Sequence, residues 1–204
     1  MNIKMIAIAA VVAIIGVGGY FLTVPEDEVD TSFAVVDMAL GEADAPVTII
    51  EYASYTCPHC RRFHEGTFQE LKRDYVDTGK VRFIYREVFF DRYGLWGAIV
   101  ARCDGEEKFF AISDMLYKQQ QTWAQGTPEE IASNLRRIGL SAGLSAEAVD
   151  ACFEDADNAS ELVAWYEANA KQDGISSTPS FVINGTTYSN MSYDDFKGVI
   201  DPLL

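Results

Sequence analysis

Two cysteines separated by two residues carry the clearest chemical signal in the sequence. They lie in the run Cys57-Pro58-His59-Cys60. Cysteines at this spacing on the first turn of a helix share one face, so they close a disulfide with little backbone motion. The chemistry that this pair predicts is thiol–disulfide exchange, in which a thiolate attacks a disulfide sulfur.

The residues around the pair predict that a helix begins there. The residue before a proline is pushed away from the α region, and proline is favoured at the first helical position. Cys57 therefore falls at the N-cap, where the helix N–H groups and the macrodipole stabilise a thiolate. We expect Cys57 to be the nucleophile and Cys60 to be the buried sulfur that resolves the mixed disulfide. His59 can donate a hydrogen bond or a positive charge to the thiolate, so the Pro58-His59 dipeptide sets the redox balance.

A zinc site and an inert structural bridge are the alternative roles for these two cysteines. A zinc site needs about four ligands, and the sequence has no second CxxC run or paired histidines to complete one. A structural bridge seldom lies where a strand passes into a helix with both sulfurs on one turn. We therefore expect neither a metal nor another cofactor.

The pattern of apolar residues predicts an α/β fold that places the dithiol helix between two buried strands. The predicted strands are 34–36, 47–52, 81–88, 180–183 and 186–188, the last two joined by an Asn184-Gly185 turn. The predicted helices are 58–75, 94–104, 106–119, 128–138, 145–154, 157–173 and a last one capped by Ser192. Gly66 lies inside the first helix, at a point where it can kink. This order fits a sheet with a helical insertion at about residues 93–173.

The chain is strongly acidic, with a net charge of −15 and a pI of about 4.4. A surface of this charge repels phosphate backbones, so nucleic acid is not expected as a partner. Hydrophobic residues make up 49% and charged residues 23% of the chain, which argues against disorder. The 204 residues are enough for one domain with a sizeable core.

The first 25 residues are predicted to lie outside the folded domain. Residues 5–25 contain no charged side chain, and a helix of this length can cross a bilayer. Lys4 precedes the segment and acidic residues follow it, so the positive-inside rule sends the rest of the chain out of the cytoplasm. The expected organisation is a transmembrane anchor (1–25), a linker (26–33) and a folded domain (34–204).

A cleaved signal peptide is the alternative interpretation of this first segment. Val17-Gly18-Gly19 offers a weak cleavage site, although apolar residues continue past it to Val24. Both interpretations place the folded domain in an oxidising extracytoplasmic space, on the periplasmic side of the membrane, where disulfides persist.

Three stretches of the sequence resemble the DsbA-like thiol:disulfide oxidoreductases of the thioredoxin superfamily. They are Ile50 to Cys60, which resembles the active-site strand and helix; Ala101-Arg102-Cys103 through Phe109 and Tyr117, which resembles the helical insertion; and Thr178-Pro179 to Gly185, which resembles the cis-proline loop and hairpin. The resemblance covers about residues 34–204. It implies a thioredoxin fold, oxidation of reduced unfolded secreted proteins, and a quinone-linked membrane reoxidant. The helical block resembles that of monomeric oxidases, so a monomer is expected.

The same resemblance implies roles for residues outside the dithiol. Glu51 matches a buried acid that moves a proton to or from Cys60, although the sequence equally allows an edge-exposed strand charge. Thr178 and Pro179 match a substrate-binding loop with a cis peptide bond that faces the dithiol. An ordinary trans proline that opens a strand is the alternative for Pro179. His64 stands where some relatives carry another acid, and we expect it to be a packing or surface histidine.

Two cysteines remain after the CxxC pair is assigned. Cys103 and Cys152 both fall in the predicted helical block, and we expect them to form a structural disulfide with each other. Two free buried thiols are the alternative.

The function that these features predict is a dithiol oxidase that donates a disulfide to secreted proteins. A disulfide isomerase or a reductase, for example in cytochrome maturation, uses the same chemistry and stays open. A binding or chaperone module in which the CxxC pair is redox-inactive is the alternative from a different class of protein.

Overall fold

A computed structural model describes residues 35–204 of the chain. The predicted membrane anchor (1–25) and linker (26–33) lie outside these residues. Within residues 35–204, no helix is long and apolar enough to cross a bilayer.

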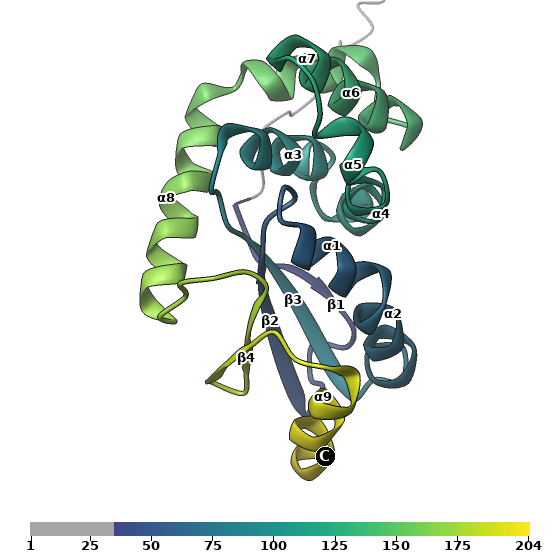
Figure 1. Ribbon diagram of the computed structural model, residues 1–204, viewed down its shortest axis with the longest axis vertical. Helices are drawn as coiled ribbons and strands as arrows, with labels where there is room; N and C mark the ends of the chain where they lie inside the picture. The colour runs from purple at the N-terminus through teal and green to yellow at the C-terminus, as the bar shows by residue number, and fades with distance from the viewer. Residues whose placement is uncertain (1–34) are drawn as a thin grey trace, which may run out of the picture.

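A five-stranded sheet forms the centre of the described part of the chain (Figure 1). The strands are β1 (Met38–Leu40), β2 (Val47–Ala53), β3 (Val81–Glu87), β4 (Ser180–Ile183) and β5 (Thr186–Ser189). Their order across the sheet is β1-β3-β2-β4-β5. β2 and β3 run parallel, which requires a crossover, and the dithiol helix supplies it. The other neighbouring strands are antiparallel.

The first strand lies four residues later than predicted, at Met38–Leu40 instead of 34–36. Burial explains the difference. Met38 is completely buried where it pairs opposite Tyr85 of β3, whereas Val36 is 44% exposed. The apolar residue that fills the core sets the register of a strand.

The helices follow the predicted order closely. They are α1 (Pro58–Glu65), α2 (Thr67–Leu71), the π-helical segment η1 (Lys72–Val76), α3 (Arg92–Arg102), α4 (Gly105–Lys118), α5 (Gln120–Trp123), α6 (Pro128–Ser141), α7 (Ala146–Glu154), α8 (Ala156–Gln172), α9 (Tyr193–Ile200) and the short 3₁₀ helix η2 (Asp201–Leu203). The predicted helix 58–75 is interrupted at Gly66, whose backbone leaves the helical region. The one-turn helix α5 was not predicted from the sequence.

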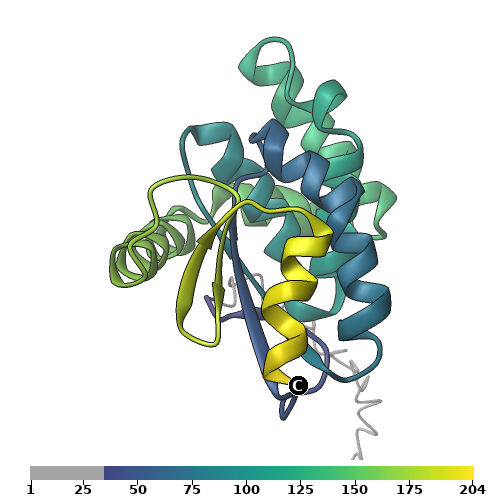
Figure 2. The same cartoon turned by 60° about the horizontal axis from the view of Figure 1, so that its bottom comes forward.

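The two faces of the sheet are covered by different helices, as Figure 2 shows. On one face, the rings of Phe63 in α1, Phe181 in β4 and Phe196 in α9 pack together, with centroids 4.8 to 5.9 Å apart. On the other face, Tyr52 of β2 packs in a smaller cluster with Ala170 of α8. Successive residues of a strand point to opposite faces, so Glu51, next to Tyr52, points towards α1.

Helices α3 to α8 form the insertion between β3 and β4, and much of it lies over the end of the sheet at which α1 begins (Figure 1). A buried ion pair joins the insertion to the sheet. The Arg102 guanidinium of α3 donates through Nε and Nη2 to both carboxylate oxygens of Glu87 in β3, each at 2.7 Å. Both side chains are almost fully buried, at 0% and 1% exposure. The insertion is therefore held in a fixed position over the dithiol.

Candidate active site

The dithiol lies at the N-terminus of α1. Cys57 is the N-cap residue, with extended backbone angles, and Pro58 occupies the first helical position. Cys57 is half-buried, whereas Cys60, one turn along, is completely buried. The Cys60 amide donates to the Cys57 sulfur at 3.5 Å. The sulfur that accepts this N-capping hydrogen bond is therefore the one of Cys57, which is partly exposed to a partner molecule.

The two sulfurs have opposite protonation preferences. A hydrogen bond from the Cys60 thiol, helped by the Thr178 side chain and the amides of Cys60 and His59, lowers the pKa of Cys57 to about 5, although partial burial opposes the shift. Burial raises the pKa of Cys60 far above its usual range, and the hydrogen bond to Cys57 and the charge of Glu51 act in the same direction. At neutral pH the reduced protein therefore holds a thiolate at Cys57 and a thiol at Cys60.

The exposed dipeptide between the cysteines acts on Cys57 through its backbone. The His59 amide is among the groups that lower the pKa of Cys57. The His59 ring instead accepts a hydrogen bond at Nδ1 from Arg62 Nη2, at 2.8 Å. We expected from the sequence that the imidazole itself would act on the thiolate. In the structure the imidazole is instead hydrogen-bonded to Arg62.

The loop before β4 faces the dithiol. The Thr178–Pro179 peptide bond is cis, and the Thr178 carbonyl oxygen lies 3.6 Å from the Cys57 sulfur. The sheet causes this approach, because Ser180 pairs opposite Tyr52 in the strand that leads to the dithiol.

A hollow of about 440 Å³ opens beside Cys57, between this loop and the start of α3. Phe90 in its wall is 60% exposed. Its neighbour Asp91 accepts hydrogen bonds from the amides of Tyr93 and Gly94, at 2.8 and 2.9 Å, and so caps α3. Asp91 also accepts from the hydroxyl of Thr56 at 2.8 Å, which ties the insertion to the residue before Cys57.

The sequence analysis singled out neither Phe90 nor Asp91. An Asp directly before a helix is a recognisable N-cap signal. The further hydrogen bond that Asp91 accepts from Thr56 could not be predicted from the sequence.

A glutamine of the missed helix α5 also supports the dithiol loop. Gln120 is buried, and its side-chain amide donates to the carbonyl oxygens of Tyr55 and Cys57, at 2.8 and 3.0 Å. Buried carbonyls need such partners. The run of polar residues around Gln120 gave no indication that this side chain points inwards.

Glu51 lies completely buried beneath the dithiol helix. One carboxylate oxygen, Oε2, is 2.8 Å from Nε2 of His64 in α1. Burial raises the pKa of Glu51, and the interactions with His64 act in the opposite direction. The structure therefore excludes the alternative of an edge-exposed strand charge.

His64 is 7% exposed and packs in the core, with its ring stacked on Tyr117 at a centroid distance of 4.2 Å. The sequence analysis expected a packing or surface histidine. The packing interpretation is correct and the surface one is wrong. Neither included the bond to Glu51, because strand and helix periodicity give the face of each residue but not its partner.

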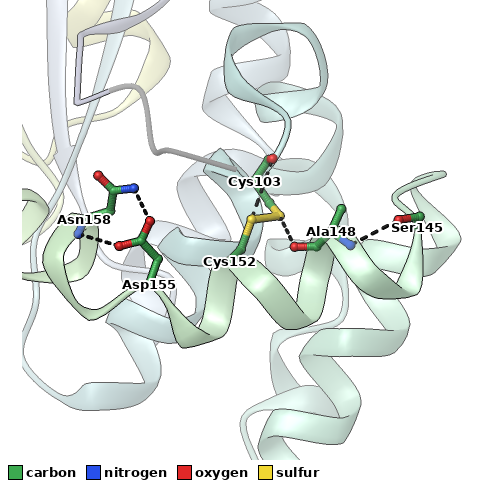
Figure 3. Close-up of a disulfide and its surroundings, with 6 residues drawn as sticks. All are labelled: Cys103, Ser145, Ala148, Cys152, Asp155 and Asn158. Atoms are coloured by element: carbon green, nitrogen blue, oxygen red, sulfur yellow. Dashed lines mark hydrogen bonds between the residues drawn. A yellow bond between two sulfur atoms is a disulfide. The ribbon is translucent and has the colours of Figure 1, made fainter. Parts of the chain in front are cut away.

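Cys103 and Cys152 form a disulfide with a Cα–Cα distance of 5.9 Å (Figure 3). Cys103 is the C-cap of α3, and Cys152 lies near the end of α7. Figure 3 also shows Ser145 capping α7 and Asp155 capping α8 through the amides of Ala148 and Asn158. The bridge joins two helices of the insertion and lies apart from the dithiol.

Comparisons with known sequences agree with this geometry. Residues 34–202 match the family Thioredoxin_4, described as thioredoxin. A Rickettsia bellii protein named "Putative protein-disulfide oxidoreductase" is 34% identical over 170 residues, which cover 82% of this chain and 64% of that protein. Disulfide bond formation protein D of Bacillus subtilis is 27% identical over 175 residues, covering 81% of this chain and 76% of that protein. This chain thus spans slightly less than two thirds of the length of its Rickettsia relative.

A solved structure shows the same architecture. Alpha-DsbA1 of Wolbachia pipientis superposes with a TM-score of 0.74 at 29% identity, and the match covers 82% of this chain and 90% of that one. The overall fold of this chain is therefore also found in that Wolbachia protein.

Proposed function

Because the chain belongs to the thioredoxin family and is DsbA-like within it, we propose that it is a protein-disulfide oxidoreductase that works as a dithiol oxidase. It donates the Cys57–Cys60 disulfide to reduced, unfolded secreted proteins. One observation carries this proposal. An accessible sulfur with a pKa of about 5 lies next to a buried sulfur whose pKa is raised.

The proposed reaction has two exchange steps. A substrate thiolate attacks the Cys57 sulfur of the disulfide form, the Cys57–Cys60 bond breaks, and Cys60 leaves and takes up a proton. A second substrate thiolate then attacks the substrate sulfur of the mixed disulfide, and Cys57 leaves as a thiolate. Two electrons pass from the substrate to the dithiol.

The low pKa of Cys57 supplies the driving force. A thiolate that is stable at neutral pH stabilises the reduced form and leaves readily, so the disulfide form is a strong oxidant. In this proposal Pro58 and His59 tune the potential, because the backbone that they form presents the amides to Cys57. Glu51 tunes it through its charge on Cys60.

The substrate chain is proposed to lie along the cis-proline loop. The carbonyl of Thr178, close to the Cys57 sulfur, is placed to pair with an extended chain in the manner of strand addition. Thr178 and Pro179 are therefore assigned to substrate binding. The exposed ring of Phe90 beside them offers an apolar contact to the side chains of an unfolded protein.

The proposed setting follows from this activity. A disulfide donor must be reoxidised, and we assign that step to a quinone-linked membrane partner. The domain acts as a monomer on the extracytoplasmic side of the membrane, held by residues 1–25. The Cys103–Cys152 disulfide supports this location, because such bonds persist in oxidising compartments.

An isomerase is the second candidate, because isomerases also carry a threonine before the cis-proline, as Thr178 is here. The oxidase and the isomerase use opposite redox forms. An oxidase acts as the disulfide, whereas an isomerase acts as the dithiol on scrambled substrates. The two activities are therefore separable in one assay.

The test uses the purified full-length chain in detergent. Its disulfide form is given a reduced, unfolded substrate, and its dithiol form is given a scrambled one. Rapid oxidation with poor rescue of the scrambled substrate is expected, and Cys57→Ser should abolish it. Efficient rescue with slow oxidation would instead identify an isomerase. Failure of both reactions would identify a redox-inactive binding module.

A further inference from the structure

A second hollow, of about 220 Å³, lies between α4 on one side and the end of α1, α2 and η1 on the other. It shares no lining residue with the hollow beside Cys57. Lys72, Asp114 and Lys118 lie in its wall, and their side chains are partly solvent-exposed. His64 forms part of the same wall. A space of this size has room for several water molecules, whose share of liquid volume is about 30 Å³ each.

His64 connects this hollow to Glu51. Its Nε2 is bonded to Glu51 Oε2 at 2.8 Å. The other carboxylate oxygen, Oε1, is buried and accepts no hydrogen bond from residues 35–204. An imidazole can accept a proton at one nitrogen while it donates from the other. The pair thus joins a wall that carries partly solvent-exposed polar side chains to a carboxylate oxygen that accepts no hydrogen bond from residues 35–204.

The proposed reaction needs a proton at a place that solvent does not reach directly. Cys60 is 0% exposed and must be protonated when it leaves the disulfide. A thiolate with a strongly raised pKa is a poor leaving group unless it is protonated as it leaves. The charge of Glu51 acts on this same sulfur.

We propose that His64 and the hollow beside it form the route by which protons pass between solvent and Glu51, the buried acid to which the family resemblance already assigns proton transfer with Cys60. The proposal rests on the dithiol chemistry of the preceding section. As the Cys57–Cys60 bond breaks, Glu51 gives its proton to the Cys60 thiolate. His64 then reprotonates Glu51 from Nε2 and takes a proton from the hollow at its other nitrogen. One proton moves from solvent to sulfur, and reoxidation of the dithiol reverses the path.

The other titratable groups around His64 are less suited than its imidazole to carry a proton through this wall. Tyr85 of β3 and Tyr117 of α4 contact its ring, and burial raises the pKa of both hydroxyls well above their usual range, so they stay protonated. Lys72 pairs with Asp77 at 2.6 Å. Lys118 pairs with Asp114 at 2.7 Å. His64 acts through Glu51 and does not touch the substrate, so it is a positioning residue.

The test measures single-turnover reduction of the disulfide form by a reduced peptide, from pH 5 to 8, in the full-length chain. His64→Gln keeps an amide donor for Glu51 but cannot carry a proton. Proton transfer by a positioned side chain commonly contributes a factor of about 10² or more. We expect His64→Gln to slow the step at least ~10-fold and to flatten its pH profile. Free imidazole added to the buffer should restore most of the rate.

Controls separate this role from a structural one. Lys108→Gln removes a surface charge of α4 that pairs with Asp104 at 2.8 Å and does not line the hollow, so it should leave the rate and the pH profile unchanged. Glu51→Gln should slow the same step, and the double variant should be no slower than the slower single variant, because both residues act in series. His64→Asn is the second variant if His64→Gln does not fold.

The outcomes distinguish this proposal from the proposed function. A His64→Gln protein with the wild-type rate and pH profile would overturn the proton route while leaving the oxidase intact. A slower variant that imidazole does not rescue would also overturn it, because His64 would then serve only packing. A wild-type protein that exchanges no disulfide at all would instead refute the proposed function.

Discussion

Cys57 and Cys60 have the same side chain and lie one helical turn apart, yet the structure gives them opposite protonation states. Position explains the difference. Cys57 is the N-cap and receives hydrogen bonds from the amides that begin the helix, whereas Cys60 is one turn inside the core. The sequence predicts this contrast, because proline at position 58 fixes where the helix begins. It does not predict that the His59 ring bonds to Arg62 or that Glu51 bonds to His64, since these partners depend on side-chain packing.

Removing the Cys60 thiol should weaken the acidity of Cys57. The hydrogen bond from Cys60 is the largest cause of the low pKa of Cys57. Cys60→Ala removes this donor and should raise the midpoint of iodoacetamide alkylation above the value of about 5 expected for the wild type. Cys60→Ser keeps a hydroxyl donor and should raise it less. Equal midpoints in all three proteins would show that the thiol donor is unimportant.

Helices and strands are joined by ion pairs and side-chain hydrogen bonds that the periodicity of apolar residues does not predict. Periodicity predicted the order of strands and helices correctly, because burial of one face decides whether a strand or a helix forms. Periodicity did not predict α5, because this helix is a single turn, and it misplaced β1, whose register depends on Met38. The pairing of Arg102 with Glu87 and of Asp91 with Thr56 has no sequence periodicity.

Breaking the buried ion pair should destabilise the domain strongly. Arg102→Met leaves the Glu87 carboxylate buried without its partner, which typically costs about 3–5 kcal/mol. The matched control is Arg136→Met, because Arg136 forms the same kind of bidentate ion pair with Asp150 on the exposed surface, at 2.7 and 2.9 Å. That change should cost under about 1 kcal/mol. Urea unfolding of both variants measures the difference, and equal losses would refute the structural role given to the buried pair.

Removing the disulfide of the insertion should lower stability without removing exchange activity. The bond joins residues 49 positions apart, and chain entropy assigns about 4 kcal/mol to a loop of this length. The double variant Cys103→Ala/Cys152→Ala should unfold at a lower urea concentration. Its alkylation profile at Cys57 should stay that of the wild type. A shifted profile would show that the insertion transmits strain to the dithiol.

At the scale of the whole molecule, the redox state and stability are coupled. The thiolate exists only in the reduced form, so its favourable environment stabilises the dithiol form relative to the disulfide form. The fold class was predictable from the sequence, because a βαβ unit, a helical block and a ββα ending fit few architectures. The two hollows, beside Cys57 and beside His64, could not be predicted from the sequence, because each is lined by side chains far apart in the chain.

The stability difference between the two redox forms should depend on pH. The pKa of Cys57 falls from 9.0 to about 5 on folding, so the unfolded reduced chain binds more protons between these values. The stability of the reduced form should therefore rise from pH 5 to 8 relative to the oxidised form, and this advantage should vanish as the pH falls through about 5. Thermal melts of both forms across this range measure it. A difference that does not change with pH would contradict the low pKa of Cys57.

The most direct test of the account is the reduction potential of the Cys57–Cys60 pair, obtained by equilibrating the full-length chain in glutathione buffers and trapping its thiols. A thiolate stabilised at Cys57 makes the dithiol the favoured form. We predict a potential far less negative than the value of about −270 mV known for thioredoxin, towards the value of about −120 mV known for DsbA. A potential within ~30 mV of thioredoxin would contradict the proposal that this dithiol donates its disulfide.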